Sequence, residues 1–222
     1  MDHTVGLTST PGFNCDLPTA NRYRSMIIGA LAWVANWTIH KLQRAKSSPE
    51  PKHFEAAERA SQYLKGTQSE CLRLGGDLVL RAFTDADFCS DTTDGKSVSG
   101  YVLLLGDVPI VGASKLQGAV TTSTVEAEYL ALCSAVKDIM WLRHLLKDLG
   151  CPQHDPTPVV LFGDNSAYIE WANDLVVSKK NRYFHVFSHL AKEQVKNGTI
   201  RMFYLKTHDQ VADILTKSFQ CR

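Results

Sequence analysis

The sequence has no paired cysteine motif, no strong charge of one sign and no long hydrophobic run. Its six cysteines are scattered without a Cys-x-x-Cys pair, which argues against a disulfide framework or a zinc site and indicates reduced thiols in an intracellular protein. The formal net charge of +1 means that any nucleic-acid interface must rest on local basic patches. The most apolar stretch, Met26–Trp37, is shorter than the roughly 20 apolar residues of a membrane span, and no signal peptide precedes the first charged residues.

The first third of the chain has the pattern of a lead-in followed by two helices. Residues 1–20 show no hydrophobic period, which predicts a flexible lead-in. Residues 22–38 predict an apolar helix, and apolar side chains at three-to-four spacing predict a second helix over 52–65. We therefore expect a helical connection segment at 21–75 and a separate domain at 76–222.

The larger domain combines strands and helices. Since 44% of the residues are hydrophobic, the chain can bury a core. Period-two and fully apolar runs predict strands, and periods near 3.6 predict helices. Strands are expected at 78–84, 98–105, 109–114, 159–162 and 200–205, and helices at 123–149, 165–173, 184–197 and 208–219. Three consecutive strands, followed by strands that alternate with helices, predict an α/β fold with a mixed sheet flanked by helices.

Two aspartates are expected where strands end. Asp85 ends the first strand, and Asp164 follows the short apolar strand at 159–162. Ligands of α/β proteins bind at such strand ends, and two carboxylates there repel each other unless a cation lies between them. Asp87 alternates to the same side as Asp85 and is an alternative ligand. Each of these aspartates, taken alone, is more often a turn or helix-cap residue.

The long helix offers one carboxylate to the sheet. Glu126 and Glu128 lie about 200° apart around a helix, so only one of them can face the sheet. Glu128 shares its face with apolar residues such as Leu132 and Ile139, whereas Glu126 fits a capping box that begins at Ser123. A glutamate on an apolar face is costly unless it is paired or metal-bound, which makes Glu128 the candidate ligand.

The last helix supplies a fourth acid. Thr207–Gln210 can cap that helix, which leaves Asp213 one turn inside it and without a capping role. His208 lies just upstream. The prediction of a metal site rests on the joint pattern of two strand-end aspartates and one acid on each of two helices, because Glu128 alone could equally pair with a nearby Lys or Arg.

Five short motifs follow one another along the chain: Phe83–Phe88, Lys96–Tyr101, Ser123–Tyr129, Asp164–Ala167 and Val211–Lys217. In content and order they resemble the motifs of the ribonuclease H domain of copia-type long-terminal-repeat retrotransposons. The segment at 21–75 resembles the end of a reverse transcriptase and its connection to that domain. The sequence departs from the family at Arg182–His185, where a Lys-His-Ile-Asp stretch is usual. It has no Tyr-x-Asp-Asp polymerase motif, so we do not expect it to polymerise DNA.

The resemblance implies a ribonuclease H-like fold with a five-stranded mixed sheet, and an endonuclease that cuts the RNA strand of RNA–DNA hybrids. It also implies two Mg²⁺ ions, for which Mn²⁺ can substitute, at the scissile phosphate. Asp85 would bridge the ions, Glu128 and Asp164 would hold one of them, and Asp213 would complete the other site. His208 would serve product release or proton transfer, with a plain surface residue as an equal alternative.

The resemblance further implies partners. Recognition of the hybrid would use the 2′-hydroxyl groups of the RNA strand and its phosphates. The candidate contact residues are Lys115, Asn165, Lys179, Lys180 and Arg182. The basic run at Lys179–Arg182 could equally be a solvated face. The reverse transcriptase domain of the same polyprotein is an expected partner and a membrane is not, and the expected location is a cytoplasmic virus-like particle or the nucleus.

Two other functions fit parts of the sequence. A catalytically silent nucleic-acid-binding or scaffold module, derived from a retrotransposon, fits the apparent loss of part of the connection after Thr38. Four retained acids argue against that function. A phosphohydrolase of the haloacid dehalogenase type fits Asp85-Ala86-Asp87 after an apolar strand, but the acidic pair that such enzymes need is absent after Asp164.

Overall fold

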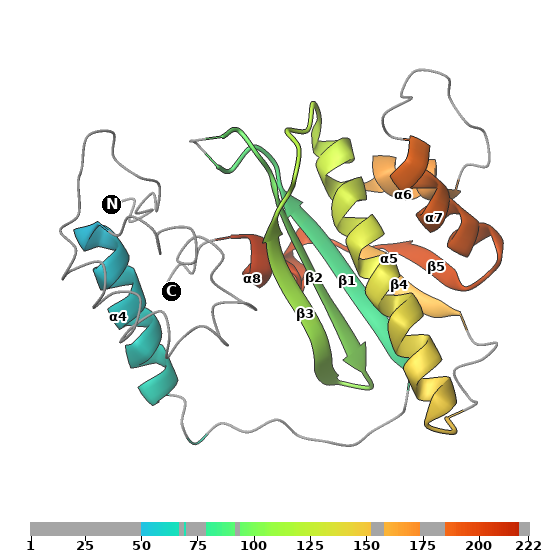
Figure 1. Ribbon diagram of the computed structural model, residues 1–222, viewed down its shortest axis with the longest axis horizontal. Coiled ribbons are helices and arrows are strands. Elements are labelled where there is room, and N and C mark those ends of the chain that lie inside the picture. The colour runs from blue at the N-terminus through green and yellow to red at the C-terminus, as the bar shows by residue number, and fades with distance from the viewer. Residues whose placement is uncertain are drawn as a thin grey trace.

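The computed structural model describes residues 50–66, 69, 79–91, 94–151, 158–173 and 185–217 (Figure 1). The predicted lead-in at 1–20, the apolar helix at 22–38 and the basic cluster Lys179–Arg182 lie outside these residues. Within the described part of the chain, every helix is too short or too polar to span a bilayer. The cysteines in this part of the chain, Cys89, Cys133 and Cys151, are free thiols.

A five-stranded sheet in the order β3-β2-β1-β4-β5 forms the centre of the domain. The strands are β1 (Leu80–Asp87), β2 (Val98–Leu105), β3 (Val108–Leu116), β4 (Val159–Gly163) and β5 (Ile200–Tyr204). The first three pair antiparallel, and β4 and β5 continue the sheet in parallel with β1. The tight turn at Gly106–Asp107 permits the antiparallel β2–β3 pair, and the parallel pairs need helical crossovers. The predicted five-stranded mixed sheet is confirmed.

Helices lie before the sheet, in the crossovers between its parallel strands and after its last strand. They are α4 (Pro51–Gly66), α5 (Thr124–Asp148), α6 (Ser166–Asn173), α7 (His185–Lys196), the 3₁₀ turn η3 (Thr207–Asp209) and the short α8 (Asp213–Thr216). Helix α5 lies against the sheet, with α6 and α7 beside it (Figure 1). Its inner side buries Leu132, Ile139 and Leu146 in one core with Leu80 and Ala82 of β1.

Opposite faces of the sheet carry α5 and α8. Side chains alternate along a strand, so β1 turns Ala82 toward α5 and turns Asp85 the other way. The hydroxyl of Thr216, in α8, donates a hydrogen bond to Asp85 and therefore places α8 on that second face. The two helices thus approach β1 from its two sides, and each carries one of the predicted acids.

The end of the chain differs from the prediction of one helix over 208–219. The predicted capping role of Gln210 is wrong, because its side-chain amide is buried and links β1 to the residue before α8. Its Nε2 donates to the carbonyl oxygen of Thr84 at 2.9 Å, and its Oε1 accepts from the backbone N–H of Ala212 at 3.2 Å. The helix is interrupted there, so Asp213 is the first residue of α8 and does not lie one turn inside a longer helix.

The first strand is longer than predicted at its end. It continues to Asp87, so Asp85 lies within β1 and not at its end. The continued antiparallel pairing with β2, in which Asp85 is opposite Gly100, explains the extension. The residues before and after Asp85 in the sequence are therefore both paired with β2, and this paired backbone fixes the position of Asp85.

Candidate active site

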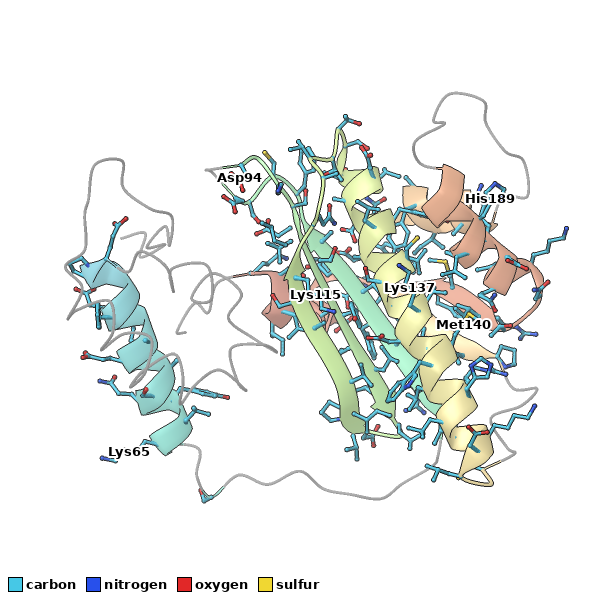
Figure 2. All side chains as sticks on the ribbon, in the orientation of Figure 1. Lys65, Asp94, Lys115, Lys137, Met140 and His189 are labelled. Carbon is cyan, nitrogen blue, oxygen red and sulfur yellow. The ribbon has the colours of Figure 1, made fainter. Side chains whose placement is uncertain are left out.

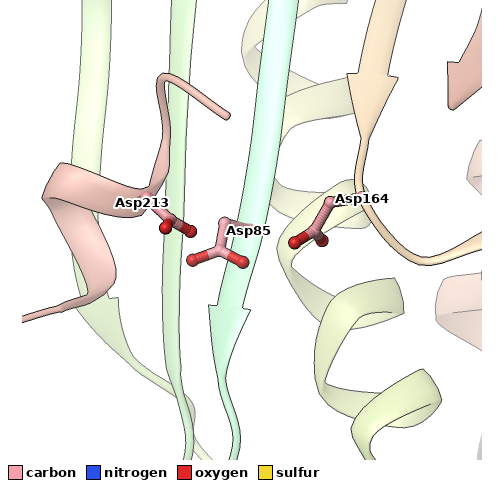
Figure 3. A group of neighbouring side chains, drawn as sticks. All are labelled: Asp85, Asp164 and Asp213. Carbon is pink, nitrogen blue, oxygen red and sulfur yellow. The ribbon is translucent and has the colours of Figure 1, made fainter. Parts of the chain in front are cut away.

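Three aspartates from distant parts of the sequence converge at one place. Asp85 comes from β1, Asp164 follows β4 directly, and Asp213 begins α8. One carboxylate oxygen of each lies within 4.8 Å of those of the other two, and the three side chains point toward one another (Figure 3). Because β1 and β4 are parallel neighbours, their C-terminal ends lie at the same edge of the sheet. Three of the four predicted acids are thus brought together, and Asp87 is not in the group.

Asp85 lies at the centre of this group and is 4% exposed. Burial raises the pKa of its carboxyl to about 6, the Thr216 hydrogen bond opposes that shift, and the charges of Asp213 and Asp164 add to it. The hydroxyl of Thr216 donates to Oδ2 and fixes the orientation of the carboxylate. The negative charges of Asp164 and Asp213 therefore repel that of Asp85, and a bound cation would offset this repulsion.

Glu128, in α5, lies close enough to this group for the charges of the three aspartates to act on its carboxylate. Its side chain is 6% exposed, and burial, followed by the charges of Asp85 and Asp164, raises its pKa to about 9. The backbone N–H of Ala86 is hydrogen-bonded to the carboxylate and opposes the shift, whereas Oε2 is buried without a hydrogen-bond partner. A buried acceptor without a partner is costly, so this oxygen is available for a cation.

The neighbouring glutamate has the structural role that the sequence predicts. Ser123 Oγ accepts a hydrogen bond from the backbone N–H of Glu126 at 3.2 Å. In return, Glu126 Oε2 accepts from the backbone N–H of Thr122 at 2.6 Å, one residue before the position of a standard capping box. Glu126 thus closes the start of α5 and leaves Glu128 to face the sheet.

The two carboxylate oxygens of Asp213 lie in different environments. Oδ2 accepts from the Lys217 ammonium, whose Nζ is 2.5 Å away, and Oδ1 is buried without a hydrogen-bond partner. Partial burial lowers the pKa of Lys217, but the hydrogen bond and charge of Asp213 outweigh it, so the pKa is raised. Lys217 therefore places one positive charge at the edge of the acidic group.

Two glycines provide the space that the site needs. A Cβ on Gly100 would lie 2.6 Å from Thr216 Cγ2 and 3.0 Å from Leu215 Cβ, so α8 can approach β2 only because no side chain is there. A Cβ on Gly163 would lie 1.4 Å from the hydroxyl oxygen of Tyr168. That buried hydroxyl, 3.3 Å from Thr84 Oγ1, fills the space behind β1 and β4.

The remaining predicted residues lie elsewhere. His208 is in η3 with a 71% exposed side chain, and its Nε2 is 3.2 Å from Asp209 Oδ2. Asn165 Oδ1 accepts from the backbone N–H of Ala167 at 3.0 Å and so caps the start of α6. Lys115 is exposed on the edge strand β3 (Figure 2). Lys179, Lys180 and Arg182 are outside the described residues.

Sequence reasoning did not single out Thr216, Lys217, Gln210 or Gly100 as site residues. Thr216 and Lys217 lie in the last of the five motifs, next to Asp213, and that position was the available signal. Gln210 was assigned to a cap, and only its buried amide reveals the bridge to Thr84. Nothing in the sequence near Gly100 indicates that α8 packs on it.

No family model matches the sequence, but curated relatives do. The chain is 32% identical over 209 residues, 90% of its length, to the retrovirus-related Pol polyprotein from transposon RE2 of Arabidopsis thaliana. It is 32% identical over 177 residues, 79% of its length, to the corresponding polyprotein from transposon TNT 1-94 of Nicotiana tabacum. The chain spans only 14% and 13% of the length of these two relatives.

Solved structures of ribonucleases H are also similar. LC11-RNase H1, isolated from compost by a metagenomic approach, aligns with a TM-score of 0.48 and 18% identity over 62% of this chain and 92% of that one. The same protein in complex with an RNA/DNA hybrid aligns with a TM-score of 0.43 and 17% identity over 61% and 92% of the two chains. On the strength of its sequence relatives and its own sheet topology, the chain belongs to the copia-type retrotransposon Pol polyproteins, in a segment that has a ribonuclease H-like fold.

Proposed function

We propose that this protein is an endoribonuclease that cleaves the RNA strand of RNA–DNA hybrids by metal-dependent phosphodiester hydrolysis. The observation that carries the proposal is the meeting of Asp85, Asp164 and Asp213 within 4.8 Å, with the buried Glu128 coupled to all three. Four acids close together, without an equal number of basic residues, are unfavourable in their charged form unless protons or metal cations bind there. The reaction would belong to reverse transcription of a retrotransposon, in a cytoplasmic virus-like particle or in the nucleus, with the reverse transcriptase domain of the polyprotein as partner.

The residues present fit divalent cations with a preference for oxygen ligands. All candidate ligands are carboxylates, which suits Mg²⁺ or Mn²⁺. Two of the carboxylate oxygens, Glu128 Oε2 and Asp213 Oδ1, are buried without a hydrogen-bond partner. Asp85, Asp164 and Asp213 would hold such ions, together with the buried carboxylate of Glu128. When bound, such ions activate the attacking water and neutralise charge on the phosphate and the leaving oxygen.

The protein's own groups would hold these ligands in place before substrate arrives. Thr216 fixes one oxygen of Asp85, and the N–H of Ala86 binds Glu128. Outer hydrogen bonds of this kind orient ligands and are usually needed for full metal affinity. Asp164 is only half-buried, which leaves the group open to a phosphodiester on that side. Asn165, next to Asp164, and Lys115 remain candidate contacts to the nucleic acid, as do Lys179, Lys180 and Arg182.

A cleavage assay tests the proposal. The full chain would be incubated with a labelled RNA–DNA hybrid, duplex RNA or duplex DNA, in Mg²⁺ and in Mn²⁺. We expect cleavage of the RNA strand of the hybrid alone, and a loss of at least about 10²-fold in Asp85→Asn because an essential ligand is weakened. Asp107→Asn is the matched control, since Asp107 is 97% exposed on the β2–β3 turn. Hybrid binding without cleavage, or cleavage that Asp85→Asn leaves intact, would instead support the catalytically silent module.

A further inference from the structure

Lys217 directly follows α8 and contacts the residue one helical turn before it. Its ammonium donates a charge-assisted hydrogen bond to Asp213 Oδ2, with Nζ and Oδ2 2.5 Å apart. The lysine side chain is 52% exposed, whereas that of Asp213 is 24% exposed. The ammonium therefore comes from the solvent side and touches the acidic group at its rim.

The ammonium acts on more than its direct partner. Burial raises the pKa of Asp85, and the charge of Lys217 opposes that shift. The charges of Asp85 and Asp164 act on Lys217 in addition to that of Asp213. An ordinary ion pair four residues apart on a helix surface joins two side chains and contributes little. Here the Lys217 ammonium interacts with three carboxylates, those of Asp85, Asp164 and Asp213, so it acts as a counter-ion for the whole group.

The Lys217 ammonium and a divalent metal ion would compete for the carboxylate of Asp213. Asp213 presents Oδ2 to Lys217, and its Oδ1 is buried without a hydrogen-bond partner. A divalent ion held by this carboxylate would stand close to the ammonium, and two positive charges at such a distance repel each other. The Lys217 side chain is long and 52% exposed, so its ammonium can turn toward solvent, whereas Asp85 and Glu128 are buried.

We propose that Lys217 is the counter-ion of the acid cluster in the metal-free protein, and that its ammonium must leave Asp213 before a divalent ion is held there. The inference rests on the proposed function, because it presupposes that Asp85, Glu128, Asp164 and Asp213 bind metal. Lys217 is then neither a ligand nor a catalytic residue. It sets the metal affinity of the site by competing for one carboxylate, and it stabilises the fold when no metal is present.

Calorimetric titration of Mn²⁺ into the metal-free full chain tests this competition. We expect Lys217→Met and Lys217→Gln to bind Mn²⁺ about 2- to 5-fold more tightly than the wild type, the range of a partly exposed ion pair. Lys217→Arg keeps the charge and should stay within about twofold of the wild type. Lys196→Met is the matched control, because Lys196 is exposed in the last turn of α7 and also loses one positive charge.

Thermal unfolding supplies a readout that needs no substrate. With a chelator present, Lys217→Met should melt about 2–4 °C below the wild type, since the carboxylates lose their counter-ion. In saturating Mn²⁺ that gap should close, because the metal replaces the ammonium. Lys196→Met should show the same difference from the wild type in both conditions.

The outcomes separate this inference from the function on which it rests. If the wild type binds Mn²⁺ and Lys217→Met binds it equally or more weakly, Lys217 does not compete with metal, and this inference is overturned while the metal site stands. If Asp85→Asn abolishes Mn²⁺ binding and Lys217→Met strengthens it, both are supported. If neither the wild type nor any variant binds Mn²⁺, both fall together.

Discussion

The hydroxyl of Thr216 donates a hydrogen bond to Asp85 Oδ2 and joins the last described helix to the first strand of the sheet. Thr216 is 4% exposed, so water cannot replace this donor. The bond holds the central carboxylate in one orientation and simultaneously holds α8, with Asp213 at its start, against β1. One buried hydroxyl therefore links two of the four acids.

Replacement of Thr216 by valine should weaken metal binding without unfolding the protein. Valine keeps the shape of the side chain but removes the donor, so Asp85 loses both its orientation and the hydrogen bond that favours its charged form. Loss of an outer hydrogen bond to a ligand costs about 10- to 100-fold in metal affinity. Cleavage rate measured against Mg²⁺ concentration should show that shift. Thr216→Ser, which restores the hydroxyl, should recover most of the affinity, and equal behaviour of the two variants would remove Thr216 from the account.

A methyl group at Gly100 should displace α8. The added Cβ would lie 2.6 Å from Thr216 Cγ2, closer than real Cβ atoms approach, and 3.0 Å from Leu215 Cβ, so we expect α8 to shift away from β2. Overpacking of this kind costs about 1–3 kcal/mol in the free energy of unfolding, and it should separate Asp213 from Asp85. Gly118→Ala is the matched control, because a Cβ there has no neighbour within 4 Å. Thermal unfolding and Mn²⁺ titration of both variants should show losses in Gly100→Ala alone.

The stability of the metal-free protein should fall as pH rises. Burial, together with neighbouring carboxylates, raises the pKa of Asp85 to about 6 and that of Glu128 to about 9. Between the ordinary values of 3.8 and 4.5 and these raised ones, the folded state binds protons that the unfolded chain has released. The free energy of unfolding, measured by denaturant titration with a chelator present, should therefore decrease from about pH 4 toward pH 9.

Glu128→Gln isolates the contribution of that buried acid. The neutral amide keeps the size of the side chain and removes its charge, so the upper part of the pH slope should flatten and the metal-free protein should gain stability near pH 8. The same variant should bind Mn²⁺ more weakly and lose cleavage activity. A pH slope that Glu128→Gln leaves unchanged would show that Glu128 is not held in the acidic field.

Local patterns sufficed for much of the fold. The order of strands and helices follows from periods of two and 3.6, and the choice of Glu128 over Glu126 follows from the faces of one helix, so neither needs knowledge of distant residues. The position of Asp164 follows from the strand that precedes it. The acids Glu128 and Asp164 could be recognised from their sequence neighbours, whereas the start of α8 at Asp213 could not.

The features that the sequence did not reveal all depend on long-range contacts. The cap predicted at Thr207–Gln210 is overridden because Gln210 bonds to Thr84, 126 residues away in the chain. The need for glycine at Gly100 arises from α8, and that at Gly163 arises from Tyr168, which only the folded packing defines. The sequence analysis gives Lys217 no role, and only its contact with Asp213 in the folded protein indicates one.

A crystal structure with Mn²⁺, in which anomalous scattering locates the ions, tests the central claim most directly. We predict ions in direct contact with Asp85 and with at least two of Glu128, Asp164 and Asp213, and a Lys217 ammonium turned away from Asp213. Crystals grown in ample Mn²⁺ with no anomalous peak among these four carboxylates would contradict the assignment of this cluster as the metal site of a nuclease.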